Sequence, residues 1–303
     1  MALTWVVFRG SELLRIFLAI VHHWNPHGDG AHQSLRPDFE PKLWALQDQL
    51  LCLRRLGVFQ GTLNISRQQV EPVNQATAHV LDIAVVTDGE HHVLDHLDAP
   101  YRPLFEHVVV KPKSSKHLGF EAQQLLVNRL DQGYDLYGYF EDDLLISDPF
   151  FFRKIDWFRR QLNDRAVLLP HRYELHRLPD QIDKLYIDGP VTTEWLEQFV
   201  PDPPAPISAG LPSGEIIFKT PENPHAGCFV LGSAQLQYWS EQPWFQDLDC
   251  GFVSPLESAA TLGLLKTFQV YKPALMHANW LELQHWGKSF RTLVGQTVKP
   301  MAS

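Results

Sequence analysis

Three consecutive carboxylates, Glu141, Asp142 and Asp143, are the residues whose types and spacing most readily suggest chemistry. They follow Tyr139 and Phe140, at the end of an aromatic run that favours a buried strand. Because adjacent acids repel one another unless something neutralises them, we expect a positively charged partner here. A divalent cation bound to oxygen ligands would be the simplest partner. The competing interpretation is a solvated acidic turn, since Asp residues also begin turns and cap helices.

The first half of the chain alternates strand patterns with helix patterns. Apolar and β-branched runs predict strands at residues 15–21, 79–87, 106–110 and 134–140. Apolar residues at helical spacing predict helices at residues 41–56, 90–97, 118–130 and 149–162. This alternation is typical of βαβ units with a parallel sheet, and in such sheets ligands bind at the carboxyl ends of the strands. The three carboxylates are therefore expected at a ligand-binding edge.

The second half of the chain is less regular. Strands are predicted at residues 166–170, 226–233 and 269–273, and helices at residues 234–239 and 255–265. Between them lies a proline-rich segment, residues 201–214. A long loop inside a domain usually acts as a linker or carries function, so we expect this segment to form a substrate-facing insertion.

Three further polar features each have two interpretations. Residues 22–30 follow the first strand and are rich in His and Gly, which suits a ligand-binding loop or a flexible surface loop. Asp88 ends the second strand, where it could contact the ribose or base of a nucleotide or begin an Asp-Gly turn. Arg172 could meet a phosphate, or it could pair with Glu174 on the surface.

Composition limits the class of protein. The chain has 303 residues, of which 45% are hydrophobic and 20% charged, as in an ordinary globular protein. The net charge of −9 argues against a nucleic-acid-binding surface, which needs a basic stripe. The apolar run Leu13–Val21 is too short to span a bilayer, and no signal peptide is recognisable. Three cysteines without a CxxC pair fit a reducing compartment, so we expect a cytoplasmic protein without an integral membrane segment.

The acidic motif resembles that of glycosyltransferases of the GT-A fold. Glu141-Asp142-Asp143 after an aromatic strand resembles their DxD motif, although its first position is Glu141 where the usual residue is Asp. A similarity to the N-acetylglucosaminyltransferase I branch extends through Phe140, Leu144, Asp148, Phe150 and Phe151. The resemblance implies that Asp143 binds Mn²⁺ or Mg²⁺, which bridges the diphosphate of the donor, and that Glu141 and Asp142 contact the sugar or ribose.

Three later residues match further landmarks of these enzymes in chain order. Gly227 matches a glycine-containing loop that approaches donor and acceptor. Glu257, at the start of a predicted helix, matches the catalytic base of inverting members, although an acid in a first helical turn also simply favours the helix dipole. A late metal-binding histidine matches His277, and His285 is a rival that spacing does not separate from it.

The sequence therefore predicts an α/β protein of the GT-A class, a Rossmann-like three-layer sandwich with a mainly parallel central sheet. We expect one domain over residues 1–303, with a nucleotide-binding half (13–143) and an acceptor-binding half (144–303). The expected function is transfer of a sugar from a nucleotide-diphosphate donor, with a UDP-sugar favoured, to a carbohydrate or other hydroxyl acceptor. The alternatives are a non-catalytic glycan-binding module with a structural metal and a sugar nucleotidyltransferase. Sugar nucleotidyltransferases usually carry a Gly-rich phosphate-binding loop after the first strand, with a Lys or Arg nearby. The second alternative is disfavoured because residues 22–30 contain glycines but no Lys or Arg.

Overall fold

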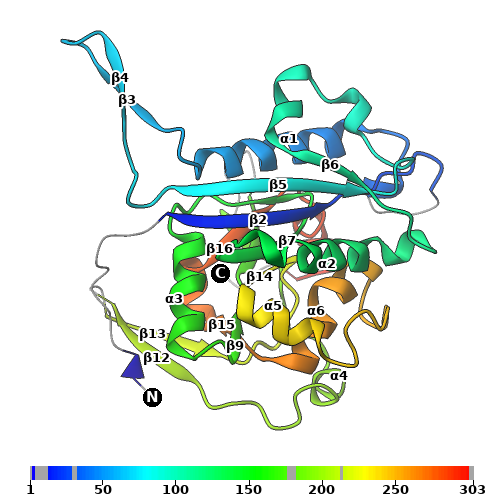
Figure 1. Ribbon diagram of the computed structural model, residues 1–303. Coiled ribbons are helices and arrows are strands. Elements are labelled where there is room, and N and C mark those ends of the chain that lie inside the picture. Colours follow the sequence, from blue (N-terminus) through cyan, green and yellow to red (C-terminus); the bar gives the residue numbers. More distant parts are fainter. Residues whose placement is uncertain (1, 4–12, 29–32, 176–181, 212–213, 300–303) are drawn as a thin grey trace.

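The computed structural model of the protein describes residues 2–3, 13–28, 33–175, 182–211 and 214–299 (Figure 1). A five-stranded central sheet has the order β14-β7-β2-β5-β6. Its strands are β2 (Leu14–Val21), β5 (His79–Thr87), β6 (Glu106–Val109), β7 (Leu136–Glu141) and β14 (Cys228–Gly232). All neighbours in this sheet are parallel except β14, which runs antiparallel to β7. The predicted α/β class with a mainly parallel central sheet is confirmed, and the arrangement is consistent with a Rossmann-like, GT-A fold.

The central strands are buried on both faces. Every residue from Ile16 to Val21 of β2 is at most 2% exposed, which explains why this strand is a continuous apolar run rather than an alternating one. Tyr139 of β7 points toward one face, where its hydroxyl donates to the Leu256 carbonyl at 3.5 Å. Asp142, three residues later, points toward the other face and pairs with Lys42. Side chains three positions apart on a strand point to opposite faces. Because Leu256 and Lys42 both belong to helices, these two contacts show that helices flank the sheet on both faces.

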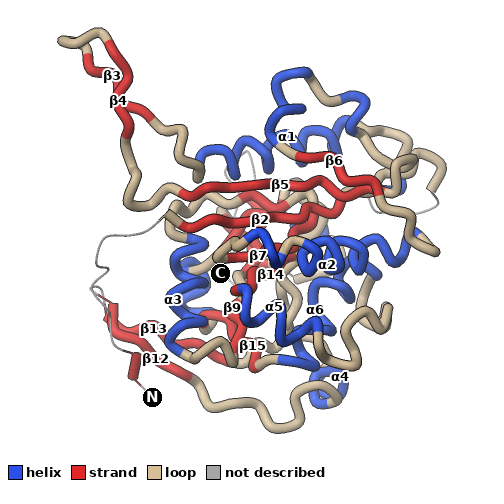
Figure 2. Tube along the Cα trace, in the orientation of Figure 1, coloured by secondary structure: helices blue, strands red, loops and turns tan. Residues whose placement is uncertain are grey.

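Five longer helices pack into the same hydrophobic core as the central sheet (Figure 2). They are α1 (Glu40–Arg55), α2 (Leu118–Asn128), α3 (Phe151–Gln161), α5 (Ser233–Ser240) and α6 (Pro255–Thr267). Each contributes apolar side chains to one continuous cluster that also contains residues of β2, β5, β7 and β14. The predicted helices and strands are thus largely present, with ends that differ by a few residues.

Two smaller sheets extend the structure beside the central one. One has the order β1-β12-β13-β15-β9, and its strands are Ala2–Leu3, Ile207–Leu211, Gly214–Lys219, Gln269–Pro273 and Ala166–Leu168. The other has the order β11-β10-β16-β8, and its strands are Lys184–Tyr186, His171–Leu175, Glu282–His285 and Leu144–Leu145. In the second sheet β8 follows the carboxylates directly and pairs with β16 near the end of the chain. Through this pairing Leu144 lies directly opposite His285, although 141 positions separate the two residues in the chain.

The structure differs from the sequence-based expectation in several places, and the short strands β8, β10, β11 and β16 are among the elements that were not expected. Residues 90–97, expected as a helix, form only a 3₁₀ turn, η2 (Leu94–His96), because Asp88 accepts the backbone N–H groups of residues 90 and 91 and holds them in a turn. The proline-rich segment 201–214 is not one loop, since Ile207–Leu211 forms β12 and pairs antiparallel with β13; residues 212–213 lie outside the described residues. The hairpin of β3 (Gly61–Asn64) and β4 (Gln69–Pro72), which was not expected, projects from the body (Figure 1).

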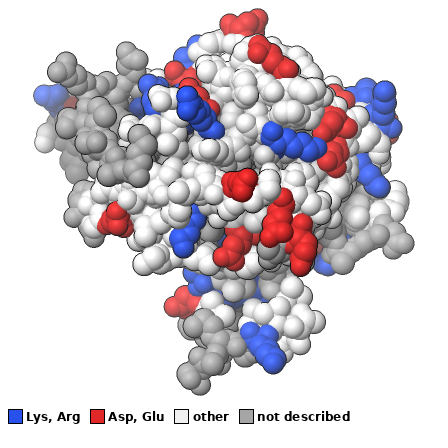
Figure 3. Space-filling view, turned by 90° about the horizontal axis from the view of Figure 1, so that it is seen from below, with Lys and Arg blue, Asp and Glu red and all other residues white. Residues whose placement is uncertain are grey.

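The described residues include no helix that is both long and apolar enough to cross a membrane. On the face shown in Figure 3, the described Lys and Arg side chains lie interspersed with Asp and Glu side chains.

Candidate active site

A cavity of about 640 Å³ lies at the carboxyl end of β7. Among the residues that line it are the three carboxylates of the acidic motif, together with Arg172, Glu257 and His285. They come from the end of β7, from β10, from the first turn of α6 and from the end of β16. The structure therefore brings together six of the residues singled out from the sequence, as expected for the ligand-binding edge of an α/β sheet.

Two basic side chains hold Asp142 in place in the lining of the cavity. Its Oδ1 accepts a hydrogen bond from the Lys42 ammonium, and its Oδ2 lies 2.5 Å from Nδ1 of His22. Nε2 of His22 accepts the backbone N–H of Val93 at 3.0 Å, so Nδ1 carries the proton and donates to Asp142. Although burial opposes ionisation, Lys42 and His22 hold the pKa of Asp142 well below its ordinary value. Both oxygens of Asp142 are therefore already paired.

Asp143, in contrast, has an oxygen without a partner. Its Oδ1 is buried and makes no hydrogen bond to any residue that the structure describes, while its Oδ2 lies 3.7 Å from Nε2 of His285. The pairing of β8 with β16 sets this approach, because His285 lies directly opposite Leu144. The backbone N–H of Trp286 donates to the Asp143 carbonyl at 2.7 Å and fixes the two chains further.

Glu174 orients His285 from behind. Its fully buried carboxylate lies 3.0 Å from Nδ1 of His285 and accepts the backbone N–H of Arg291 at 2.7 Å. Burial lowers the pKa of His285, but Asp143 and Glu174 outweigh it and raise the pKa above its ordinary value. A carboxylate behind a histidine, with the other ring nitrogen directed at an acidic ligand, is the arrangement that orients metal-binding histidines. Asp143 and His285 therefore fit a divalent cation.

Glu257 and Glu141 lie on either side of a buried histidine. Nε2 of His225 is 3.7 Å from Oε1 of Glu257 and 3.8 Å from Oε1 of Glu141. Burial raises the pKa of Glu141 to about 8 against the opposing charge of Arg172, and Asp143 and Glu257 add smaller contributions in the same direction as burial. Burial also raises the pKa of Glu257. Glu257 sits in the first turn of α6, where the side chain of Ser254 caps the helix by accepting the Glu257 backbone N–H at 3.4 Å.

Arg172 is held by an acid that the sequence patterns did not single out. Its side chain contacts Oδ1 of Asp188 through Nε at 2.9 Å and through Nη2 at 2.8 Å, and Lys272 contacts Oδ2 of the same carboxylate at 3.1 Å. Nη1 of Arg172 lies 3.9 Å from Glu141. Arg172 thus faces the cavity and does not pair with Glu174 on the surface; Glu174 is buried and serves His285 instead.

The remaining predicted residues, Gly227, Asp88 and His277, do not line the cavity. Gly227 has a φ of +64°, and a Cβ at this position would lie 2.9 Å from Oε2 of Glu141, so only glycine fits against the acid. Asp88 lies one residue beyond β5 and contacts His23, which does line the cavity. His277 lies in the 3₁₀ segment η6 (Leu275–Trp280) and is not among the lining residues. Its rival His285 does line the cavity and lies 3.7 Å from Asp143.

Three residues that the sequence did not single out complete the site: Lys42, Asp188 and His225. His22 belongs to the loop 22–30 that the sequence did indicate, and Glu174 was considered only as a surface partner of Arg172. His285 was named as a rival of His277, but the sequence did not reveal that it ends the short strand β16, which lies between β10 and β8. Lys42 gave no signal, because it occupies a helix and looks like an ordinary surface lysine.

The sequence matches no protein-family profile, and a search of curated proteins finds no match. Among solved structures, the crystal structure of S. aureus TarS is similar over 90% of this chain, with a TM-score of 0.40 and 11% sequence identity. The chain spans 37% of the length of that protein chain. Because a likeness at this level says nothing of chemistry, the function is argued from the site alone.

Proposed function

We propose that the protein is a metal-dependent glycosyltransferase, which moves a sugar from a nucleotide-diphosphate donor, with a UDP-sugar favoured, to a hydroxyl acceptor. The observation that carries this proposal is the pair formed by Asp143 and His285. A buried carboxylate with one unpartnered oxygen and an imidazole held by Glu174 both face a cavity large enough for a nucleotide-sized ligand.

The ligand types suit Mn²⁺ or Mg²⁺, and the residues that would hold the ion are Asp143 and His285. Hard divalent cations take carboxylate oxygens, and Mn²⁺ also accepts imidazole. A bound ion would neutralise charge that develops on the leaving diphosphate. Two protein ligands suffice for a metal shared with a substrate, because diphosphate oxygens and water supply the other positions.

Glu257 is the proposed base of the transfer. In an inverting reaction the acceptor oxygen attacks the anomeric carbon of the sugar, the bond from that carbon to the diphosphate breaks, and the acceptor proton passes to the Glu257 carboxylate. A base is most effective when its pKa approaches the working pH, and burial raises the pKa of Glu257 in that direction.

Glu141 and Asp142 have different proposed roles. Burial raises the pKa of Glu141 to about 8 in the metal-free protein, so Glu141 is the acid of the motif that could keep a proton and donate a hydrogen bond to a sugar hydroxyl. Asp142 instead positions its neighbours, because both of its oxygens are occupied by Lys42 and His22. Arg172 faces the cavity as a cation that could meet a phosphate oxygen.

Calorimetric titration with UDP, and then GDP, tests the proposal with and without Mn²⁺. We expect one nucleotide to bind only with the metal, and Asp143→Ala to weaken this binding at least about 100-fold, since it removes a direct ligand. Asp131→Ala removes an exposed acid outside the cavity and should bind like the wild type. If neither nucleotide binds in the presence of Mn²⁺, while glycans do, the alternative of a glycan-binding module replaces the transferase.

A further inference from the structure

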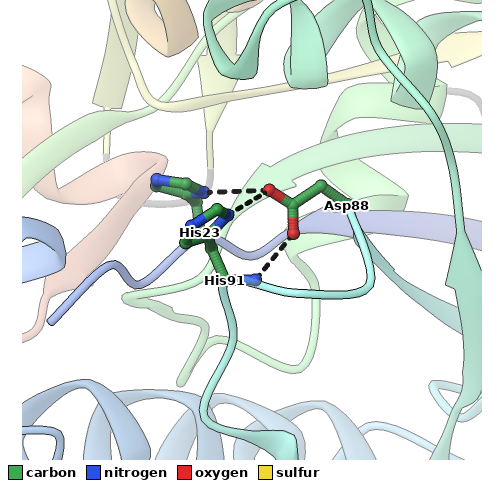
Figure 4. Close-up of side chains that lie close together, drawn as sticks. All are labelled: His23, Asp88 and His91. Atoms are coloured by element: carbon green, nitrogen blue, oxygen red, sulfur yellow. Dashed lines mark hydrogen bonds and ion pairs between the residues drawn. The ribbon is translucent and has the colours of Figure 1, made fainter. Parts of the chain in front are cut away.

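A second group of metal-type ligands lies outside the Asp143 and His285 pair. His23 belongs to the segment after β2, and Asp88 and His91 belong to the turn after β5. Figure 4 shows the three side chains converging, with both imidazoles directed at the same carboxylate. Each residue offers one ligand atom, and these atoms lie within 4.8 Å of one another.

The backbone already orients the carboxylate of this group. Oδ1 of Asp88 accepts the backbone N–H groups of Glu90 at 2.9 Å and of His91 at 2.7 Å. Oδ2 is thereby turned toward the imidazoles and lies 2.8 Å from Nδ1 of His91 and 4.0 Å from Nδ1 of His23. Although burial opposes it, these backbone donors and His91 hold the pKa of Asp88 at about 2, so the carboxylate is ionised as a metal ligand must be.

His23 supplies an independent sign of a missing partner. Its Nδ1 is buried and makes no hydrogen bond within the described part of the chain, although its ring faces Oδ2 of Asp88. A buried ring nitrogen without a partner costs stability, and most such groups in folded proteins are satisfied. The 4.0 Å gap to Asp88 is too long for a hydrogen bond, but it is close to the separation of two ligands that share an ion.

We propose that His23, Asp88 and His91 bind one transition-metal ion of the Zn²⁺ class. Two imidazoles and a carboxylate favour Zn²⁺ or Co²⁺ over Mg²⁺ or Ca²⁺, which prefer oxygen ligands. With metal–ligand bonds of about 2.0–2.1 Å, tetrahedral ligand atoms lie roughly 3.3 Å apart. This value lies between the 2.8 Å of the Asp88–His91 contact and the 4.0 Å of the Asp88–His23 contact, so each of these two contacts would change by less than about 1 Å. Three protein ligands leave a position open for water or a ligand atom.

This ion would tie the segment after β2 to the turn after β5 beside the cavity, because His23 also lines that cavity. The proposal does not depend on the transfer reaction, since its three ligands are separate from Asp143 and His285. It also gives Asp88 a different role from the ribose contact predicted from the sequence.

Titration of the full, tag-free chain with Co²⁺, followed by visible absorption, tests this site. We expect the wild type to develop the d–d bands of a Co²⁺ ion with nitrogen and oxygen ligands, at one equivalent, and to retain them in Asp143→Asn. His91→Ala should lose these bands and bind Zn²⁺ at least about 100-fold more weakly, since removal of an outer partner alone costs about 10–100-fold. His91 is partly exposed, so this variant should fold.

His27→Ala is the matched control, because it removes an exposed histidine from the same segment as His23. It should bind Co²⁺ and Zn²⁺ like the wild type. The assignment is overturned if the wild type shows no such bands, if His91→Ala retains them, or if Asp143→Asn abolishes them. The last outcome would move the ion to the Asp143 and His285 pair, while leaving the proposed transferase intact.

Discussion

Glu257 is the side chain on which an inverting transfer would depend most directly. Glu257→Gln keeps the size and hydrogen-bonding shape of the side chain but cannot accept the acceptor proton. We expect turnover of the donor sugar to fall roughly 100-fold or more, as when a general base is lost, while Mn²⁺-dependent nucleotide binding changes little. Release of nucleotide from the donor in the presence of acceptor, measured beside calorimetry, separates the two effects.

Glu215→Gln removes an exposed acid elsewhere in the chain and should leave turnover unchanged. Equal turnover by Glu257→Gln and the wild type would assign the proton transfer to another group and return Glu257 to the role of a residue that favours the start of α6.

At the same residue scale, the carboxylates and Glu257 could be predicted because each stands next to a clear strand or helix pattern. Their partners could not be predicted, since the contacts join distant positions. Asp142 meets Lys42 across 100 residues and His22 across 120 residues. A single sequence carries no trace of such pairs beyond residue types that look ordinary.

At the scale of elements, one buried ion pair links α1 to the end of β7. Lys42 is 3% exposed, and its ammonium contacts Asp142 and lies 3.9 Å from Asp143. Lys42→Met would leave Asp142 buried with only His22 as partner. Removal of one member of a buried pair costs about 3–5 kcal/mol, so we expect the free energy of unfolding to fall by that amount in urea titrations.

The double variant Lys42→Met with Asp142→Asn separates this cause from lost packing. The neutral amide oxygen can still accept from His22, so the double variant should recover most of the loss. Lys113→Met changes an exposed lysine and should stay within about 0.5 kcal/mol of the wild type. Equal losses in the single and double variants would show that the pair does not hold α1 in place.

The elements themselves were largely predictable, and the exceptions have a common physical cause. β12 escaped prediction because its residues follow a proline-rich stretch and gain their structure from pairing with β13. β8 and β16 are short strands that pair with each other and so become visible only in three dimensions. The position of His285 beside Asp143 depends on that pairing, which explains why spacing could not separate His285 from His277.

At the scale of the whole molecule, residues from both predicted halves build one sheet and one core. β14 lies beyond residue 144 but pairs with β7, and the hydrophobic cluster contains side chains from either side of that position. The cavity likewise takes the three carboxylates of the acidic motif from the first half and takes Arg172, Glu257 and His285 from the second. The stability of the fold is therefore coupled to the buried charges that line the cavity.

This coupling predicts how stability depends on pH in metal-free protein. Glu141 has an ordinary pKa of 4.5 when unfolded and about 8 when folded, so the folded state keeps its proton longer. Its contribution is complete below the unfolded value and is lost as the pH rises through the folded value. Asp142 and Asp188, whose pKa values are lowered, act in the opposite sense at acidic pH, so the effect of Glu141 must be isolated by difference.

Glu141→Gln isolates it, because the amide stays neutral at every pH. We expect this variant, compared with the wild type by urea unfolding in EDTA, to gain relative stability between about pH 5 and about pH 9, by a few kcal/mol at most. Glu194→Gln, an exposed control, should follow the wild type throughout. If the curves of Glu141→Gln and the wild type stay parallel across this range, then Glu141 is ionised in the folded protein. It could then only accept hydrogen bonds from a sugar, and the donor's hydroxyl groups would have to supply the protons.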